Sequence, residues 1–251
     1  MTFIDYRIYK KNALIILFAC WLLILGGYIT SFYYDIVTAR GLILFGKNII
    51  STSDIAKFGV IIFLASYIEV NKKRINDMRL ISYELLPYLL TTLLLIFFQP
   101  DMSTTFTVTM ILLLLIFVAG IRIEYIFSFL FCSAFIVVSK IVFTSFQRVR
   151  FLNWWSGNGD IQSGASILAL SKGGFLGSGL VESEFSKGLL PAVHTDFILP
   201  IIGEEFGFLG ILSIFILFYF FMFYSIRILQ NVSDSFGFFL GLGIIMNVLI
   251  Y

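Results

Sequence analysis

Long apolar stretches separated by short polar segments dominate the hydrophobic pattern of the 251-residue chain. Each stretch is close to the roughly 20 residues that an α-helix needs to cross the hydrocarbon core of a bilayer. Seven stretches fit this description: residues 13–32, 55–70, 82–98, 104–120, 124–143, 197–226 and 236–251. Because a helix satisfies its own backbone hydrogen bonds in lipid, the pattern predicts an all-α polytopic membrane bundle of about seven transmembrane helices.

The charges between these stretches are unevenly distributed. Segments 7–11 and 69–84 are rich in Lys and Arg, and Arg122 and Arg227 fall on the same side if the helices alternate strictly in direction. Short cytoplasmic loops of membrane proteins accumulate Lys and Arg. We therefore expect this side to be cytoplasmic, and the segment of about 144–196 to form a long extracytoplasmic loop of a bacterial inner-membrane protein.

Composition supports a membrane protein and excludes other classes. Hydrophobic residues make up 59% of the chain and charged residues 13%, whereas soluble domains average about 25% charged residues. The mean hydropathy of +0.99 is too high for a soluble or disordered chain. A net charge of +2 without a long basic run argues against a nucleic-acid partner. No fixed repeat or low-complexity tract divides the chain, so a single domain over 1–251 is the simplest partition.

The residues that bind metals or nucleotides are sparse. Cys20 and Cys132 lie in apolar runs without CxxC spacing, which argues against a disulfide framework or a thiolate metal site. A lone histidine, His194, does not suffice for a histidine-cluster site, although carboxylates leave room for a divalent cation. The phosphate-binding loop motif of ATPases does not occur in the sequence, so we expect no nucleotide cofactor.

Polar residues gather at the start of the second predicted helix. Ser51 and Asp54 match a capping box, in which a hydroxyl and an acid bind the free backbone amides of the first helical turn. Lys57 does not fit this explanation, because a cation near a helix N-terminus opposes the helix dipole. We expect an anionic group beside Lys57; snorkelling of its ammonium to the membrane interface is the alternative.

The predicted outer segments hold further candidates. Asp101 follows a Gln-Pro turn, where turn and N-cap chemistry is the simpler explanation. Arg148, Arg150 and the glycine-rich stretch 173–179 are residue types that suit phosphate oxygens. Asp196 is either an N-cap of the next helix or a functional acid.

Two consecutive carboxylates, Glu204 and Glu205, lie about two turns into that apolar helix. At membrane depth they must be paired, protonated or in contact with water. A polar cavity open to the outside would satisfy them.

Several of these segments together resemble the SEDS family (shape, elongation, division and sporulation proteins, the FtsW/RodA/SpoVE group). His194 to Phe197 and Gly203 to Gly210 match the family's His-Thr-Asp-Phe and Gly-Glu-Glu-x-Gly-x-x-Gly patterns. Segments 53–57, 99–101 and 147–150 resemble its Pro-Ser-Glu-x-x-Lys, Gln-Pro-Asp and Tyr-Gln-x-x-Arg motifs. Order and spacing agree over nearly the whole chain, and the spacing after Ser183 leans slightly to FtsW.

The resemblance implies a peptidoglycan glycosyltransferase that polymerises lipid II in cell division or elongation. It assigns the acid/base role to Asp196, and substrate contacts to a further group of residues. This group comprises Arg40, Asp54, Lys57, Asp101, Arg148, Arg150, Ser166 and His194. The implied partners are a class B penicillin-binding protein and other division or elongation proteins. A lipid II flippase and an inactive scaffold of the division machinery remain alternatives.

The sequence departs from the family pattern in several places. Arg40 is retained from Lys-Gly-x-x-Arg-Trp without the tryptophan, Pro-Ser-Glu has become residues 52–54, and Gln-Ser has become residues 165–166. Ser103 replaces the glycine of the Gln-Pro-Asp-x-Gly-Thr motif. The match begins at the family's third crossing and ends within its ninth, so we expect a partial domain or a degraded relative.

Overall fold

The computed structural model describes residues 5–33, 41–44, 47–99, 102–156, 161–179 and 198–250. The chain forms two compact units. Unit 1 comprises residues 1–140 and 226–251, and unit 2 comprises residues 141–225. Each is described separately below.

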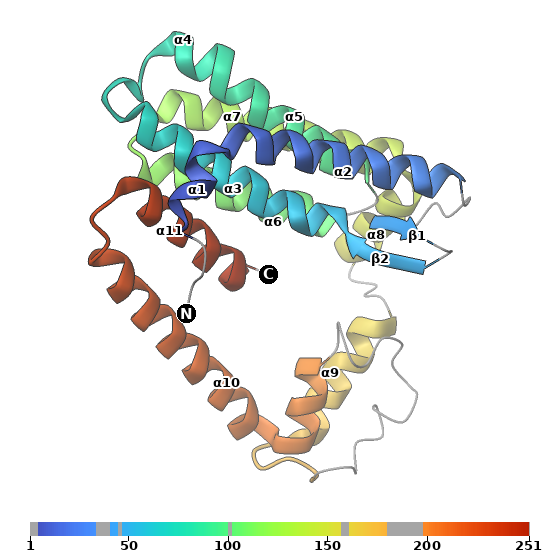
Figure 1. Cartoon of the computed structure of the whole chain (residues 1–251). Helices are drawn as coiled ribbons and strands as arrows, with labels where there is room; N and C mark the ends of the chain where they lie inside the picture. The colour runs from blue at the N-terminus through green and yellow to red at the C-terminus, as the bar shows by residue number, and fades with distance from the viewer. Residues whose placement is uncertain are drawn as a thin grey trace. The chain divides into compact units, whose positions relative to one another are not determined.

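Unit 1 is a helical bundle with a short β-hairpin (Figure 1). Its helices are α1 (Arg7–Lys11), α2 (Ala13–Tyr33), α3 (Thr52–Val70), η1 (Lys72–Arg74), α4 (Met78–Leu80), η2 (Ile81–Leu85), α5 (Leu86–Phe98), α6 (Met102–Val118), α7 (Ile123–Phe143) and α11 (Ser235–Ile250). The hairpin pairs β1 (Gly41–Leu44) with β2 (Lys47–Ser51) in antiparallel fashion and leads directly into α3.

Every predicted apolar stretch coincides with a helix, which confirms the all-α membrane fold. In the described part of the chain, four helical segments are long and apolar enough to cross a membrane: Ala13–Thr30, Met78–Phe98, Ile123–Phe143 and Ile198–Gln230. Ser103–Val118 and Ser235–Ile250 are shorter apolar helices. The number of seven crossings stays a prediction, and the hairpin is an element that the hydrophobic pattern did not indicate.

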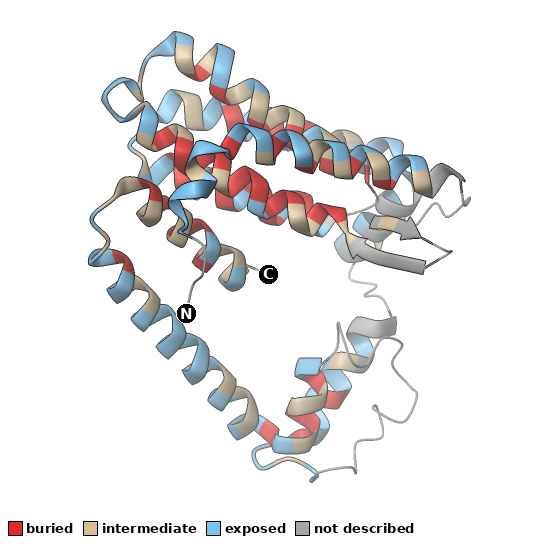
Figure 2. Ribbon diagram, in the orientation of Figure 1, coloured by how far each residue is buried: buried red, intermediate tan, exposed pale blue. Residues whose placement is uncertain are grey.

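Helix α3 is the core of unit 1. Twelve of its 19 residues are buried, and it packs against α2, α6 and α11. Figure 2 shows this burial along α3. Contact with α2 is close because Gly59 has no side chain: a Cβ atom there would lie 2.4 Å from the Cys20 Sγ atom. Small residues at helix crossings allow such approach, which supplies van der Waals contact where lipid weakens the hydrophobic driving force.

A π-helical turn precedes Pro87 in the helix that runs from Met78 to Phe98. Proline lacks an amide hydrogen and its ring clashes with the carbonyl four residues earlier in a regular α-helix. The π-helical η2 ends at Leu85, and Pro87 then lies in the first turn of α5. The wider turn fits the proline, so the apolar helix continues without a break.

Polar contacts join the basic segments of unit 1 at one end of the bundle, here called the basic end. The Lys10 Nζ atom lies 2.9 Å from a Glu69 carboxylate oxygen, and the Lys72 Nζ atom donates to the Ser235 Oγ atom at 3.0 Å. The Arg122 amide donates to the Asn76 side chain at 2.8 Å. These bonds confirm the prediction that the basic segments share one side of the bundle.

The opposite end of unit 1, here called the hairpin end, is where α2 and α5 finish and α3 begins. The Tyr28 hydroxyl donates to the Phe98 carbonyl and ties the end of α2 to the end of α5. The end of α5 is in turn joined to the start of α3 by a side-chain bond described below. The predicted alternation of helix direction therefore holds for these helices.

Unit 2 contains α8 (Ser145–Trp155), α9 (Ile161–Gly173) and most of α10 (Ile198–Gln230). In Figure 1, α9 runs beside the first turns of α10. The two helices approach each other closely at Gly203 of α10, where a Cβ atom would lie only 2.4 Å from a methyl group of Leu170 in α9. Helices α8 and α9 fall within the segment that was predicted to be a loop.

Candidate functional site

The first turn of α3 holds a buried ion pair at the hairpin end of unit 1. The Lys57 Nζ atom lies 2.6 Å from the Asp54 Oδ1 atom. The Lys57 side chain is only 4% exposed, whereas the Asp54 side chain is 42% exposed. A buried ammonium needs a nearby anion to offset its loss of hydration, and Asp54 supplies that anion. The expected anionic neighbour of Lys57 is thus present, and the snorkelling alternative is wrong.

The expectation of a capping box at Ser51 is also wrong. Ser51 is the N-cap residue of α3, but its side chain makes no hydrogen bond to a backbone amide of the helix. Instead the Ser51 hydroxyl donates to the Asp54 Oδ2 atom. One carboxylate oxygen of Asp54 therefore faces Ser51 and the other faces Lys57, which fixes the orientation of the acid.

A buried hydrogen bond ties the end of α5 to the start of α3. The Gln99 Nε2 atom donates to the Thr52 Oγ1 atom at 2.7 Å, and both residues are buried. Thr52 directly follows the hairpin and lies in the first turn of α3, so this bond holds the end of α5 beside the helix turn that carries the ion pair. An amide–hydroxyl bond out of water is costly to lose, because each unpaired buried partner costs about 1–3 kcal/mol.

Aliphatic side chains enclose Lys57. It lines a narrow internal space together with Val60 and Ile61 of α3 and Val108, Ile111 and Leu112 of α6. In surroundings of low polarity a charge acts over a short distance with little screening. Asp54 therefore offsets the charge of Lys57 at short range, and the side of the pair that is open to solvent is the carboxylate.

In unit 2, three predicted residues lie on helices. Arg148 is on α8 and exposed, and Arg150 lies on the same helix. Ser166 is half-buried on α9. The role of each in substrate binding stays a prediction.

Glu204 and Glu205 lie where α10 is broken. Gly207 has φ 65° and ψ −159°, a conformation that L-residues with side chains rarely adopt. Glu204 is 1% exposed and Glu205 is half-buried. The two acids thus precede a helix break, which is a common position for functional groups in membrane helices.

The glycine-rich segment after α9 holds this break in place. The Ser178 amide and hydroxyl both donate to the Glu204 carbonyl at 2.9 Å, and the Gly179 amide donates to the Glu205 carbonyl at 3.2 Å. In return the Phe208 amide donates to the Gly174 carbonyl at 3.0 Å. These backbone groups satisfy one another, so the amides of Ser178 and Gly179 are not phosphate ligands as the glycine pattern had indicated.

Four predicted residues lie outside the described residues: Arg40, Asp101, His194 and Asp196. Their positions in the site rest on the sequence. Within the ranges that the structure describes, His, Cys, Asp and Glu do not form a group of three or more that could hold a metal ion. The binding of a divalent cation therefore stays an expectation from the sequence.

Sequence reasoning missed Ser51 and Gln99 as members of the site. Each was noted only as part of a motif, Ser51 as a cap and Gln99 as a turn residue. A signal was present for Gln99, because a long polar side chain at the end of an apolar helix needs a buried partner. The partner, Thr52, is 47 residues away in the chain, so only the fold reveals the pair.

Known proteins resemble the chain along nearly its whole length. The family model described as "Cell cycle protein" (FtsW/RodA/SpoVE) matches residues 1–251. A protein of Trichlorobacter lovleyi named probable peptidoglycan glycosyltransferase FtsW is 33% identical over 256 residues, which cover 96% of this chain and 65% of that protein. Stage V sporulation protein E of Bacillus subtilis is 30% identical over 254 residues, which cover 98% of this chain and 69% of that protein.

A solved structure shares the fold. It shows the structural coordination of polymerization and crosslinking by a peptidoglycan synthase complex. One of its chains matches with a TM-score of 0.67 and 20% identity, over 98% of this chain and 69% of that chain. The chain thus spans about two thirds of the length of the proteins that it matches.

Proposed function

Because the chain belongs to the FtsW/RodA/SpoVE family of cell cycle proteins, we propose that it is a peptidoglycan glycosyltransferase that polymerises lipid II in cell division or elongation. The observation that carries this proposal is the buried Lys57–Asp54 pair at the hairpin end of unit 1. In the proposed site Lys57 acts together with the arginines that the family resemblance assigns, and these cations bind the diphosphate group of the substrate. Relatives named as probable peptidoglycan glycosyltransferases support the same activity.

In the proposed reaction Asp196 acts as the base. Its carboxylate takes the proton from the 4-hydroxyl group of the acceptor glucosamine while the hydroxyl oxygen bonds to C1 of the donor sugar. The bond between C1 and the diphosphate oxygen breaks, and the diphosphate lipid leaves with the electron pair. Arg40, Lys57, Arg148 and Arg150 offset the negative charge that grows on the leaving group.

The remaining predicted residues position these groups. Asp54 holds Lys57, and Gln99 joins the end of α5 to the start of α3. Ser166 and His194 contact the substrate in the proposed site, and Glu204 and Glu205 line a polar cavity. The hairpin end and segment 144–196 then face the outside of the bacterial inner membrane, where the sugars of lipid II are polymerised.

We also propose a class B penicillin-binding protein as the partner, together with other division or elongation proteins. The similarity in fold to a chain of a peptidoglycan synthase complex supports this assignment. Such a partner supplies the transpeptidase that crosslinks the glycan strands. Membrane lipid surrounds the apolar helices.

Polymerisation of fluorescent lipid II in liposomes tests the function. The wild-type chain, Asp196→Ala and Glu184→Ala are compared, each with and without a class B penicillin-binding protein; Glu184→Ala removes another carboxylate from the same segment. We expect glycan strands from the wild type and Glu184→Ala, and a loss of at least about 100-fold in Asp196→Ala, the usual contribution of a general base.

Two results would overturn the proposal. If Asp196→Ala forms glycan strands at the wild-type rate, Asp196 is not the base. If the folded wild-type chain forms no glycan strands with its partner, the chain is not a polymerase. Lipid II translocation measured in the same liposomes would then distinguish a flippase from an inactive scaffold.

A further inference from the structure

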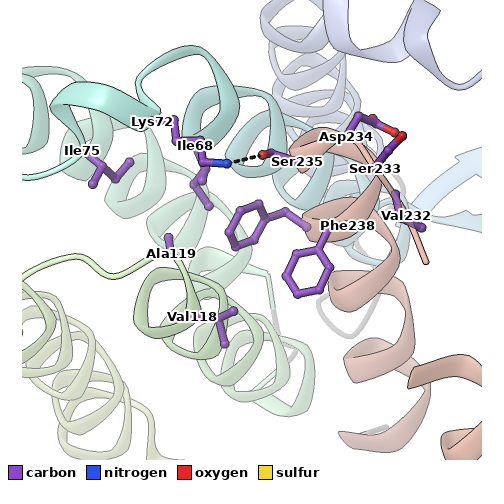
Figure 3. A pocket seen from close by; sticks show the side chains of 11 residues that line it. Ile68, Lys72, Ile75, Val118, Ala119, Val232, Ser233, Asp234, Ser235 and Phe238 are labelled. Carbon is purple, nitrogen blue, oxygen red and sulfur yellow. Dashed lines mark hydrogen bonds between the residues drawn. The ribbon is translucent and has the colours of Figure 1, made fainter. Parts of the chain in front are cut away.

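A cavity of about 380 Å³ opens at the basic end of unit 1, away from the ion pair of α3 (Figure 3). Three parts of the chain line it: the end of α3 with the turn that follows, the end of α6, and the start of α11 with the turn before it. All three belong to unit 1. None of the cavity's residues takes part in the proposed glycosyl transfer, so the cavity needs a separate explanation.

The lining of the cavity has an apolar part and a polar part. Ile68, Val118, Phe238 and Phe239 form the apolar part, and Figure 3 shows the Phe238 ring beside the opening. The polar part is formed mainly by Lys72 and by residues 233–235. A ligand that fills such a space has a hydrocarbon portion and a polar portion, as an amphiphile does.

The polar part favours an anion. Lys72 donates one of its three N–H groups to the Ser235 Oγ atom at 3.0 Å, and among the described residues no carboxylate lies within ion-pair distance of it. Two further cations, Lys73 and Arg74, follow directly in the chain. A phosphate oxygen near Lys72 would find an ammonium with unused donors and a serine hydroxyl beside it.

Asp234 also lines the cavity, but both of its carboxylate oxygen atoms already accept hydrogen bonds. Its Oδ1 atom accepts a hydrogen bond from the Tyr6 hydroxyl at 2.6 Å, and its Oδ2 atom accepts one from the Gly237 amide at 2.9 Å. The bond from Tyr6 lowers the pKa of Asp234, and the acid serves to cap α11 and to hold the N-terminal segment. Among the lining residues Lys72 therefore has donors left for an anion, whereas both oxygen atoms of Asp234 already accept hydrogen bonds.

The cavity lies between the ends of apolar helices. Its walls are the ends of apolar helices, since α3 ends at Val70 and α6 ends at Val118, and η1 with its three cations follows α3. Basic residues near the ends of membrane helices attract anionic lipids. A peptide partner would share the anionic and apolar character, but the position of the cavity between the ends of apolar helices favours a lipid.

We propose that this cavity binds one anionic phospholipid, with the phosphate at Lys72 and Ser235 and the start of an acyl chain against Val118, Phe238 and Phe239. The lipid would bridge α3, α6 and α11, which are distant in the chain. It would thereby stabilise the basic end of the bundle in membranes rich in anionic lipid.

Native mass spectrometry of the protein in neutral detergent tests this site. Phosphatidylglycerol and phosphatidylcholine are titrated separately into the wild type, Lys72→Gln, Lys73→Gln and Ala119→Trp. Lys73→Gln removes the same charge from a neighbour outside the lining, and Ala119→Trp fills the apolar part without changing the charge. Thermal unfolding confirms that each variant is folded.

We expect phosphatidylglycerol to bind about tenfold more tightly than phosphatidylcholine, and Lys72→Gln to lose about tenfold of that affinity. Lys73→Gln should lose less than about threefold, as exposed charges do, and Ala119→Trp should abolish the bound lipid. Equal losses in the two lysine variants would mean general surface attraction and would overturn the proposal. Equal affinity for the two lipids, or displacement by millimolar inorganic phosphate, would overturn it as well. If Ala119→Trp does not fold, the comparison of Lys72→Gln with Lys73→Gln still tests the proposed site.

Discussion

Lys57 is a charge enclosed by the core of unit 1, and Asp54 is the carboxylate that stabilises it. The ammonium is almost fully buried, but the carboxylate is 42% exposed and bound by Ser51 on its other side. This asymmetry means that solvent or substrate reaches the acid more easily than the cation.

Asp54→Ala should destabilise the protein because it removes this carboxylate from a buried ammonium. Breaking a buried pair costs about 3–5 kcal/mol, and the partial exposure of Asp54 reduces the expected loss to about 1–3 kcal/mol. The double variant Asp54→Ala/Lys57→Met should regain most of the lost free energy of unfolding, because no charge is then buried. Chemical unfolding in detergent measures both.

The Lys10–Glu69 pair provides the control for this experiment. Its side chains are 36% and 22% exposed, so Glu69→Ala should cost less than about 1 kcal/mol. If Asp54→Ala and the double variant lost equal stability, Lys57 would not depend on Asp54, and the description of the pair would be incorrect.

At the scale of elements, the contact of α2 with α3 depends on Gly59. A Cβ atom there would lie 2.4 Å from the Cys20 Sγ atom, closer than any ordinary contact. Gly59→Ala should therefore cost about 1–3 kcal/mol through overpacking, although alanine favours helix. Cys20→Ala removes the sulfur atom, so Gly59→Ala combined with Cys20→Ala should recover part of the stability.

Gly26→Ala in α2 is the matched control, because a Cβ atom there would meet nothing within 4 Å. It should be neutral or stabilise the protein by up to about 1 kcal/mol. Thermal unfolding of the four variants distinguishes the two glycines. Equal effects of Gly26→Ala and Gly59→Ala would contradict the close crossing of α2 and α3.

The hydrophobic pattern predicted the helices well and their irregularities poorly. Apolar length alone sets where a chain enters and leaves the bilayer, so all seven stretches are helical. The break at Gly207 escaped prediction, because it depends on bonds from residues 174–179 that no local pattern reveals. The hairpin before α3 and helices α8 and α9 also escaped, since their segments are too short to span a membrane.

The sequence predicted one contact of the candidate site and missed another. Motif order identified Asp54 and Lys57 and expected an anion near the lysine, as the structure has it. The bond from Gln99 to Thr52 joins separate helices, so it follows from tertiary packing. The assignment of Asp196, Arg40, Asp101 and His194 still rests on the resemblance.

At the scale of the whole molecule, the resemblance to the FtsW/RodA/SpoVE family is confirmed by the match over residues 1–251. The chain spans about two thirds of its relatives' length, so the activity of this chain must be measured directly. Unit 1 carries two distinct features, the ion pair at the hairpin end and the cavity at the basic end. The central claim is that the ion pair serves glycosyl transfer.

The most direct test of this claim is the rate of lipid II polymerisation by wild type, Lys57→Met and Lys10→Met, each with a class B penicillin-binding protein. Lys10→Met removes a cation at the basic end and should retain the wild-type rate. Lys57→Met should stay folded and lose at least about 100-fold in rate, the typical effect of removing one preorganised charge from a reacting centre. A folded Lys57→Met protein that polymerises lipid II at the wild-type rate would contradict the claim.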